Sequence, residues 1–373
     1  RICGICPVAY MMSAVHAMER MLGMEPDDGI RRLRRLLYCG EWIESHVLHI
    51  YLLHAPDFLG FDDAMAMAVK HKEAVTRGLR MKKAGNSIVK LLGGREIHPI
   101  NVKVGGFYKI PDHAALCALL DELKWSRDAA ADTVRWTAGF EFPDLHRDYE
   151  FVALRHPSEY PFNEGRIVSS SALDISVDQY PEHFAENQVA HSTALHSRRI
   201  PGNTPYCVGP MARFNLNRDR LSGATRELAV THGFDRQVHN AFESIVVRAL
   251  EVFQAFDEAI ALIENFVAPS QAALAIPAGG GVAMAATEAP RGLLFHRYEV
   301  DAQGLIQRAT IVPPTSQNQL TIEDDLRDLV QSKLHLPDAE LTWRCEQAIR
   351  NYDPCISCAT HFLKLQRRDG TDA

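Results

Sequence analysis

Two pairs of cysteines with the spacing C-x-x-C stand at opposite ends of this 373-residue chain. Cys3 and Cys6 form the first pair, and Cys355 and Cys358 form the second. The C-x-x-C spacing lets two thiolates bind one metal ion, and four thiolates complete the coordination shell of a soft or borderline metal. If the two ends of the chain meet in space, the residues between them are the scaffold of one metal site.

Three interpretations of these pairs remain open on spacing alone. The pairs can form a structural zinc site, a catalytic or redox metal site, or two unrelated motifs. Zinc ribbons bring their pairs within about 15–20 residues of each other, so the long separation here favours a site that the whole fold assembles. A thioredoxin-like dithiol needs one pair in a β-α-β setting, which this sequence lacks.

Other side chains with suitable chemistry accompany the cysteines. Asp353 precedes Cys355 by two residues, and His361 follows Cys358 by three. Arg291 follows a proline and precedes a glycine, and its planar guanidinium suits an anionic or polar ligand. An ordinary exposed arginine is the competing interpretation. Four isolated cysteines are predicted to be ordinary buried thiols: Cys39, Cys117, Cys207 and Cys345.

The elements that must position these residues are mainly helical. Pro7 suits the first turn of a helix that runs to Leu22, with the first cysteine pair in the turn before it. In such a turn, backbone N–H groups and the helix dipole stabilise thiolates. Further helices are predicted over residues 30–55, 62–92, 111–137, 218–266, 321–334 and 338–350.

The β structure is predicted to be small. Residues 292–300 and 306–312 have strand-like composition and flank a short turn, which predicts a β-hairpin. The stretch 140–215 is rich in proline, aromatic and β-branched residues and predicts irregular chain with short strands. The predicted fold class is therefore mainly α, within α+β, with a large helical bundle core and small sheet elements. We expect residues 1–361 to form one domain.

Composition and charge exclude several classes of function. The formal net charge of −7 and the pI near 6.2 give no basic field for nucleic acid. No apolar run is long enough to predict a helix that spans a membrane. Residues 279–281 are glycines, but they lack the G-x-G-x-x-G spacing of a nucleotide-binding loop. The chain begins at Arg1, directly on the first cysteine pair, so we expect that an N-terminal segment is missing.

The two cysteine pairs, in their full sequence contexts, resemble a known family. The nickel–iron hydrogenase large subunit has paired signatures similar to RICGICP at residues 1–7 and DPCISCATH at residues 353–361. The resemblance continues in order through motifs at residues 44–57, 93–99, 208–213, 288–292 and 311–315. It covers essentially the whole chain, which makes it highly specific.

This resemblance implies a metal centre at the cysteines. In the family, four thiolates hold nickel, and by position these are Cys3, Cys6, Cys355 and Cys358. Cys6 and Cys358 correspond to the thiolates that bridge to an iron carrying carbon monoxide and cyanide. His361 matches a histidine that binds a magnesium or iron ion away from the nickel.

The resemblance also implies roles for residues around the metals. The expected reaction is heterolytic cleavage of H2, or its reverse, with the thiolate of Cys355 as the base. Arg291 is expected to orient groups above the metals because a charged arginine is a poor base. Asp57 and Asp353 match the carboxylates beside that arginine. The expected pocket around the diatomic ligands includes Pro290, Arg291, Pro313 and Thr315.

Partners and maturation follow from the same resemblance. Electrons are expected to pass to an iron–sulfur small subunit. Tyr10, where many relatives have histidine, and residues 313–315 are most similar to the soluble cytoplasmic branch coupled to NAD(P). That branch implies further diaphorase or flavin subunits. Nickel-insertion factors and a protease are expected to mature the chain, and the protease would remove residues 362–373.

Two alternatives to a hydrogenase remain. One is a non-catalytic relative that resembles the quinone-site subunit of respiratory complex I, but such relatives have lost the cysteines that are present here. The other is a structural zinc-binding protein. Metal analysis separates these possibilities, because nickel together with iron is expected only in the hydrogenase.

Overall fold

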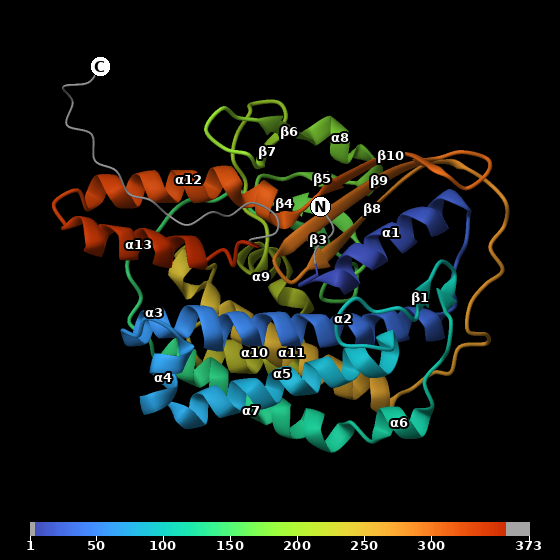
Figure 1. The fold of residues 1–373 in the computed structure, drawn as a ribbon, viewed down its shortest axis with the longest axis horizontal. Coiled ribbons are helices and arrows are strands. Elements are labelled where there is room, and N and C mark those ends of the chain that lie inside the picture. Colours follow the sequence, from blue (N-terminus) through green and yellow to red (C-terminus); the bar gives the residue numbers. More distant parts are fainter. Residues whose placement is uncertain (1–3, 356–373) are drawn as a thin grey trace.

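The computed structural model describes residues 4–355. Helix α1 (Pro7–Met21) and a three-stranded sheet lie above a layer of long helices in Figure 1. Within the described residues, helices predominate and the sheets are small, so the predicted fold class is confirmed. The long helices of the lower layer are α2 (Asp28–Leu48), α5 (Lys72–Gly93), α7 (Leu120–Ala138) and α11 (Ser244–Glu264).

Helix α2 begins at a capping residue and ends in a wider turn. The carboxylate of Asp27 accepts a hydrogen bond from the amide of Ile30 at 2.9 Å, which satisfies one of the unpaired amides at the helix start. The chain then continues through a π-helical turn at His49–His54 into α3 (Ala55–Leu59). The predicted helix over residues 30–55 is therefore confirmed, although its last part is not α-helical.

Two glycines let α2 and α5 pack closely. A Cβ atom on Gly85 of α5 would lie 2.9 Å from the carbonyl oxygen of Gly40 in α2. A Cβ atom on Gly40 would lie 3.1 Å from the carbonyl oxygen of Gly85 and 2.8 Å from Val89 Cγ2. Because backbone atoms cannot rotate away, the short distance between these helices depends on glycine at both positions.

The remaining helical regions agree broadly with the prediction. The predicted helix over 62–92 is interrupted at His71 and forms α4 (Ala64–Lys70) and α5. Helix α11 is buried on nearly every side, which matches its predominantly apolar sequence. The other short elements on this side of the molecule are β1 (Val102–Lys103), β2 (Gly106–Phe107), α6 (His113–Cys117) and α10 (Gly223–Thr231).

An antiparallel sheet supports α1. Its strands are β8 (Gly281–Ala289), β9 (Gly292–Val300) and β10 (Ile306–Val312), in the order β10-β9-β8. The predicted hairpin corresponds to β9 and β10, but β8 was not predicted. Its sequence is rich in alanine and begins with glycine, and both residue types are depleted in strands.

Helix α1 is attached to β8 by polar and apolar contacts. The hydroxyl groups of Ser13 and Thr287 are 2.8 Å apart and hydrogen-bonded. Arg20 donates a hydrogen bond to the carbonyl oxygen of Met284 at 2.8 Å. A small apolar cluster fills the space between helix and sheet and includes Ala17, Ala285, Tyr298 and Val300.

The region 140–215 holds short strands, as predicted, and two short helices. One sheet has the order β3-β4-β5, and a separate hairpin pairs β6 (Phe184–Gln188) with β7 (Leu195–Arg199). Helix α9 (Pro210–Asn217) was not predicted, because most of it falls within the stretch that the sequence predicted to be irregular. The other elements of this region are β3 (Val152–Arg155), β4 (Arg166–Ser169), β5 (Asp174–Ile175) and α8 (Tyr180–His183).

The last two helices return the chain to the centre of the molecule. Helix α12 (Pro314–Ser332) begins well before residue 321, where the prediction placed its start. Pro314 occupies its first turn, a position that proline suits, so the Pro313-Pro314 pair marks the helix start. Helix α13 (Asp338–Arg350) has the predicted bounds. Among the described helices, none combines the length and the apolar character that crossing a membrane requires.

Candidate metal centre

Cys6 lies at the N-terminus of α1, as the sequence predicted. It occupies the capping position before Pro7, and its residue is 4% exposed. Glu41 of α2 accepts hydrogen bonds from the amides of Val8 at 2.6 Å and Ala9 at 3.0 Å. This fully buried carboxylate therefore holds the first turn of α1 and with it the backbone that carries Cys6. Sequence reasoning missed Glu41, because it is distant in sequence from the cysteine pair.

Cys355 is the only member of the second pair that the described residues include. It is 2% exposed and belongs to the same buried cluster as Cys6. Its amide donates a hydrogen bond to Thr315 Oγ1 at 3.3 Å, so the start of α12 contacts the second cysteine motif. Cys3, Cys358 and His361 lie outside the described residues.

Arg291 joins the two cysteine motifs. Its Nε donates to the carbonyl oxygen of Asp353 at 2.7 Å, and its Nη2 donates to Asp353 Oδ1 at 3.0 Å. Burial opposes the charge of the guanidinium, but Asp353, Cys6 and Cys355 together outweigh it and raise the pKa of Arg291 above its ordinary value. Arg291 is therefore a buried cation between both motifs, and not the exposed arginine of the competing interpretation.

The β8–β9 turn fixes the position of Arg291. Ala289 pairs with Gly292, so Pro290 and Arg291 form the two-residue connection between the strands. A Cβ atom on Gly209 would lie 2.7 Å from the carbonyl oxygen of Arg291, and Gly209 has a φ of +109°. Glycine at residue 209 therefore lets the chain before α9 pass directly against the arginine backbone.

Arg213 of α9 binds the backbone of the same β8–β9 turn. Its guanidinium donates to the carbonyl oxygens of Ala289 at 2.9 Å and Pro290 at 2.8 Å. It also forms ion pairs with Glu251 at 2.8 Å and Glu288 at 3.0 Å, and all three charged side chains are fully buried. The cost of burying these charges is offset because each is paired and hydrogen-bonded. Arg213 and Glu288 both lie in motifs that resemble the family, but the spacing of these motifs in the sequence did not indicate an ion pair between them.

Asp57 is hydrogen-bonded to the end of α13. Its carboxylate accepts hydrogen bonds from Arg350 Nε at 2.7 Å and Nη2 at 2.8 Å, and its carbonyl oxygen accepts one from Gln347 at 3.0 Å. Asp353 is hydrogen-bonded to Arg291 directly, whereas the role of Asp57 beside Arg291 stays a prediction. Asp57 thus acts on the segment that leads into the second cysteine motif.

The π-helical turn after α2 holds that segment as well. His49 Nε2 donates to the carbonyl oxygen of Arg350 at 2.7 Å, and His54 Nε2 donates to Asn351 Oδ1 at 2.9 Å. Ser244 at the start of α11 donates to the carbonyl oxygen of Asn351 at 3.0 Å. Burial lowers the pKa of both histidines well below the ordinary value, so both are neutral.

The predicted pocket residues are buried in the same region. Pro290 and Pro313 are buried, and Thr315 is 4% exposed. Tyr10 lies one turn into α1 and packs edge-on against His296 with 5.6 Å between the ring centres. Outside this region, Cys39, Cys207 and Cys345 are buried as predicted, but Cys117 is exposed at the end of α6, so its predicted burial is wrong.

The described residues fit a metal that prefers thiolates. Cys6 and Cys355 are both buried and both raise the pKa of Arg291, so thiols from opposite ends of the chain lie close to one guanidinium. Arg291 Nη1 and Asp353 Oδ2 are buried and have no hydrogen-bond partner within residues 4–355. Buried polar atoms are normally satisfied, so these two atoms indicate that the site is shaped to contact a further group.

Comparisons with known proteins identify a family for the chain. The family model described as nickel-dependent hydrogenase matches residues 1–83. Sulfhydrogenase 1 subunit alpha of Pyrococcus furiosus is 30% identical over 369 residues, which cover 98% of this chain and 86% of that protein. The NAD-reducing hydrogenase HoxS subunit beta of Cupriavidus necator is 25% identical, over 97% of this chain and 83% of that protein.

The fold is also shared with solved structures. The crystal structure of an NAD+-reducing [NiFe]-hydrogenase in the H2-reduced state superposes with a TM-score of 0.86 and 23% identity, over 97% of this chain and 87% of that chain. A nickel–iron–selenium hydrogenase from Desulfomicrobium baculatum superposes with a TM-score of 0.74 and 18% identity, over 97% of this chain and 88% of that chain. The near-complete coverage of relatives at 30% identity establishes that the chain belongs to the nickel-dependent hydrogenase family, whose members are oxidoreductases that act on H2.

Proposed function

We propose that this chain is the catalytic subunit of a nickel–iron hydrogenase that cleaves H2 reversibly into protons and electrons. The observation that carries the proposal is the position of Arg291. It is a buried cation beside Cys6 and Cys355, it is oriented by Asp353, and its Nη1 has no partner within the described residues. A buried N–H group next to thiols is a suitable donor for a ligand or substrate at the metals.

The cysteines would hold the metal centre. We assign nickel to Cys3, Cys6, Cys355 and Cys358, with Cys6 and Cys358 also bound to an iron that carries carbon monoxide and cyanide. When bound, this centre supplies the heterolytic cleavage of H2. Pro290, Pro313 and Thr315 would line the pocket for the diatomic ligands, and His361 would bind a separate magnesium or iron ion.

Three residues around the metals have different proposed roles. Arg291 keeps its proton because nearby negative groups raise its pKa, so it orients and does not act as the base. Asp353 fixes two of its nitrogens and leaves Nη1 available. The thiolate of Cys355 is the proposed base, and the hydrogen bond from its amide to Thr315 fixes its backbone.

Electron transfer requires partner chains. Outside the two C-x-x-C motifs, the four other cysteines are isolated in sequence, so the chain offers no cysteine set for an iron–sulfur cluster of its own. We propose an iron–sulfur small subunit as the direct partner. The NAD-reducing relative supports coupling to NAD(P) through flavin-containing subunits in the cytoplasm.

A pair of serine variants tests the proposed metal ligands. Cys3→Ser should abolish nickel retention and H2 oxidation, because it removes one of four thiolates. Cys117→Ser is the matched control, since this exposed cysteine lies at the end of α6 and should leave both unchanged. Full nickel content in Cys3→Ser would contradict the assignment.

Maturation has a separate test. We propose that a protease removes residues 362–373 after nickel insertion, which leaves His361 as the last residue of a single domain. The intact mass of the purified, nickel-loaded chain should correspond to a C-terminus at His361. An active enzyme that retains these residues would reject the proposal.

A further inference from the structure

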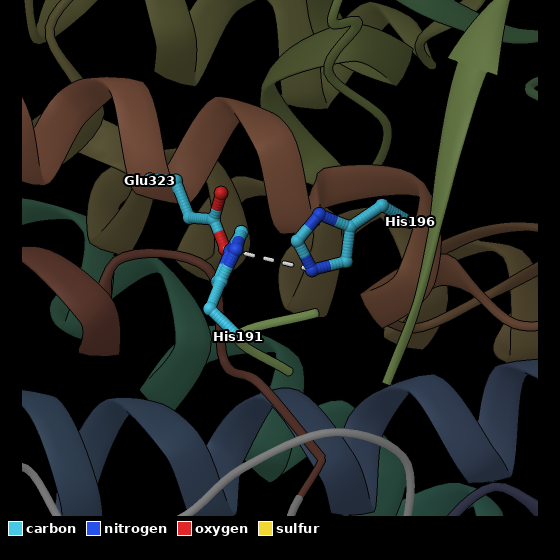
Figure 2. A group of neighbouring side chains, drawn as sticks. All are labelled: His191, His196 and Glu323. Atoms are coloured by element: carbon cyan, nitrogen blue, oxygen red, sulfur yellow. Dashed lines mark hydrogen bonds and ion pairs between the residues drawn. The ribbon is translucent and has the colours of Figure 1, made fainter. Parts of the chain in front are cut away.

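A second group of potential metal ligands lies away from the cysteines. His191 comes from the connection between β6 and β7, His196 from β7, and Glu323 from α12. Figure 2 shows the two imidazole rings and the carboxylate turned toward one another. One potential ligand atom from each residue lies within 4.8 Å of the other two. Nothing in the proposed hydrogenase function uses these residues.

The distances within this group suit a small metal ion. His191 Nε2 lies 3.0 Å from Glu323 Oε1, and His196 Nε2 lies 3.5 Å from the same oxygen. Ligand atoms around a tetrahedral zinc ion at its usual bond lengths are about 3.4 Å apart. Small side-chain rotations are therefore enough to place a zinc ion between the three groups.

His196 provides the second observation. Its side chain is fully buried, and neither ring nitrogen has a hydrogen-bond partner in the described part of the chain. Buried polar atoms without a partner are rare in native proteins and call for a ligand, ion or water. The Nε2 atom faces the carboxylate of Glu323, so a metal ion bound there would satisfy it (Figure 2).

Two of the three residues lie on elements that are joined to each other, and the third is exposed to solvent. Strand β7 pairs with β6 in regular register, and Glu186 of β6 accepts a hydrogen bond from Ser316 of α12 at 2.9 Å. His196 and Glu323 are thus on elements that are already joined. His191 has 65% of its side chain exposed, which gives an ion access from solvent.

We propose that His191, His196 and Glu323 bind one zinc ion and so fasten the β6–β7 hairpin to α12. Two imidazoles and one carboxylate are a ligand set that zinc accepts, with water in the fourth position. Glu323 supplies the negative charge of the site. This charge is needed because the nearby Arg198 carries a positive charge that would repel a cation at His196. The same helix contacts Cys355 through Thr315, about two turns before Glu323, so the zinc ion would steady a helix that borders the cysteines.

Metal content of the mature, nickel-loaded protein tests the proposal. The protein is equilibrated with Zn2+, dialysed, and measured for zinc and nickel together. We expect about one zinc per chain in the wild type and in the control His335→Ala, which removes an exposed histidine between α12 and α13. His191→Ala and Glu323→Gln should each weaken zinc binding at least about a hundredfold with nickel unchanged.

Several results would overturn the proposal. The proposal is wrong if the wild type binds no zinc, or if either His191→Ala or Glu323→Gln retains it. Loss of nickel in parallel with zinc would also overturn it, because the proposed site is separate from the cysteines. Misfolding is not a concern for His191→Ala, since that side chain is largely exposed and its contacts within the described residues are to Glu323 and His196 of the proposed site itself.

Discussion

Arg291 uses one edge of its guanidinium for Asp353 and leaves Nη1 without a partner inside the described site. Lysine keeps the positive charge, but its three N–H groups share one nitrogen and cannot reproduce the planar fork that binds Asp353 at two positions and places a third nitrogen in the site. The geometry of the arginine is therefore as important as its charge.

Arg291→Lys should lower kcat for H2 oxidation by about a hundredfold or more while nickel content stays the same. The loss follows from the missing donor and from the lost orientation by Asp353. Activity assays with metal analysis measure it, and Arg308→Lys on β10 is the matched exposed control. A kcat close to the wild-type value in Arg291→Lys would contradict this role.

Some residue roles could be predicted from the sequence and others could not. Arg291 and Asp353 could be predicted because each stands beside a recognisable motif. Glu41 and Glu251 could not, because their function depends on contacts with residues far away in sequence. The ion pair between Asp57 and Arg350 could not be predicted for the same reason, since the two residues are far apart in sequence.

At the scale of elements, the start of α1 depends on one carboxylate from α2. Glu41→Gln should leave one of the amides of Val8 and Ala9 without an acceptor, since glutamine has a single carbonyl oxygen. We expect a loss of about 1–3 kcal/mol in the free energy of unfolding, together with weaker nickel retention.

Denaturant unfolding and metal analysis measure the effect of Glu41→Gln. The matched control is Glu340→Gln, an exposed residue in the first turn of α13, which should change stability by less than about 0.5 kcal/mol. Equal stability and equal nickel content in both variants would show that Glu41 does not position the cysteine.

The contact between α2 and α5 makes a separate prediction. Gly85→Ala places a Cβ atom 2.8 Å from Ile43 Cγ2 and 2.9 Å from the carbonyl oxygen of Gly40. Alanine favours a helix by about 1 kcal/mol over glycine, but the overpacking should exceed this gain and lower stability by about 1–3 kcal/mol. Denaturant midpoints measure the change.

Gly223→Ala in α10 is the control for this helix contact. A Cβ atom there meets nothing within 4 Å, so the substitution should be neutral or stabilising by less than about 1 kcal/mol. If Gly85→Ala were also stabilising, the close approach of α2 and α5 would not limit the residue at position 85.

Elements were predictable where the local pattern was strong. The long helices and the β9–β10 hairpin follow from apolar spacing and turn residues. Strand β8 was missed because its alanine-rich sequence is a weak local signal for a strand and packing fixes its conformation. The early start of α12 was missed although Pro314 suits the first turn of a helix. Strand β8 buries most of its inner residues against α1 and β9.

At the scale of the whole molecule, the α12–α13 pair, the β8–β10 sheet and α1 lie above the layer of long helices (Figure 1). Sequence reasoning predicted that the chain ends meet, because four thiolates at the two ends fit one metal. Cys6 and Cys355 both lie close enough to Arg291 to raise its pKa, whereas the positions of Cys3 and Cys358, outside the described residues, stay a prediction.

Buried histidines make the stability of the whole molecule depend on pH. Burial lowers the pKa of His296 from 6.5 to about 3, and burial lowers that of His46 to about 4 despite the opposing effect of Glu251. The unfolded chain therefore takes up protons below about pH 6.5 while these folded side chains stay neutral. Their contribution to stability is present above that pH and is lost as the pH falls, by about 1.4 kcal/mol each at pH 5.5.

Denaturant unfolding at pH 7.5 and pH 5.5 tests this dependence. The wild type should be less stable at pH 5.5, and His296→Gln should lose about 1.4 kcal/mol less between the two values because glutamine does not titrate. An identical loss in the wild type and the variant would show that His296 does not stay neutral in the folded protein.

The central claim is that this chain holds a nickel–iron centre at its two cysteine motifs. Infrared spectroscopy of the purified, mature protein, combined with metal analysis, tests it most directly. We expect about one nickel and one iron per chain at the cysteines, with bands from bound carbon monoxide and cyanide that disappear with nickel in Cys3→Ser. A protein whose cysteines hold zinc, with no nickel and no such bands, would contradict the claim.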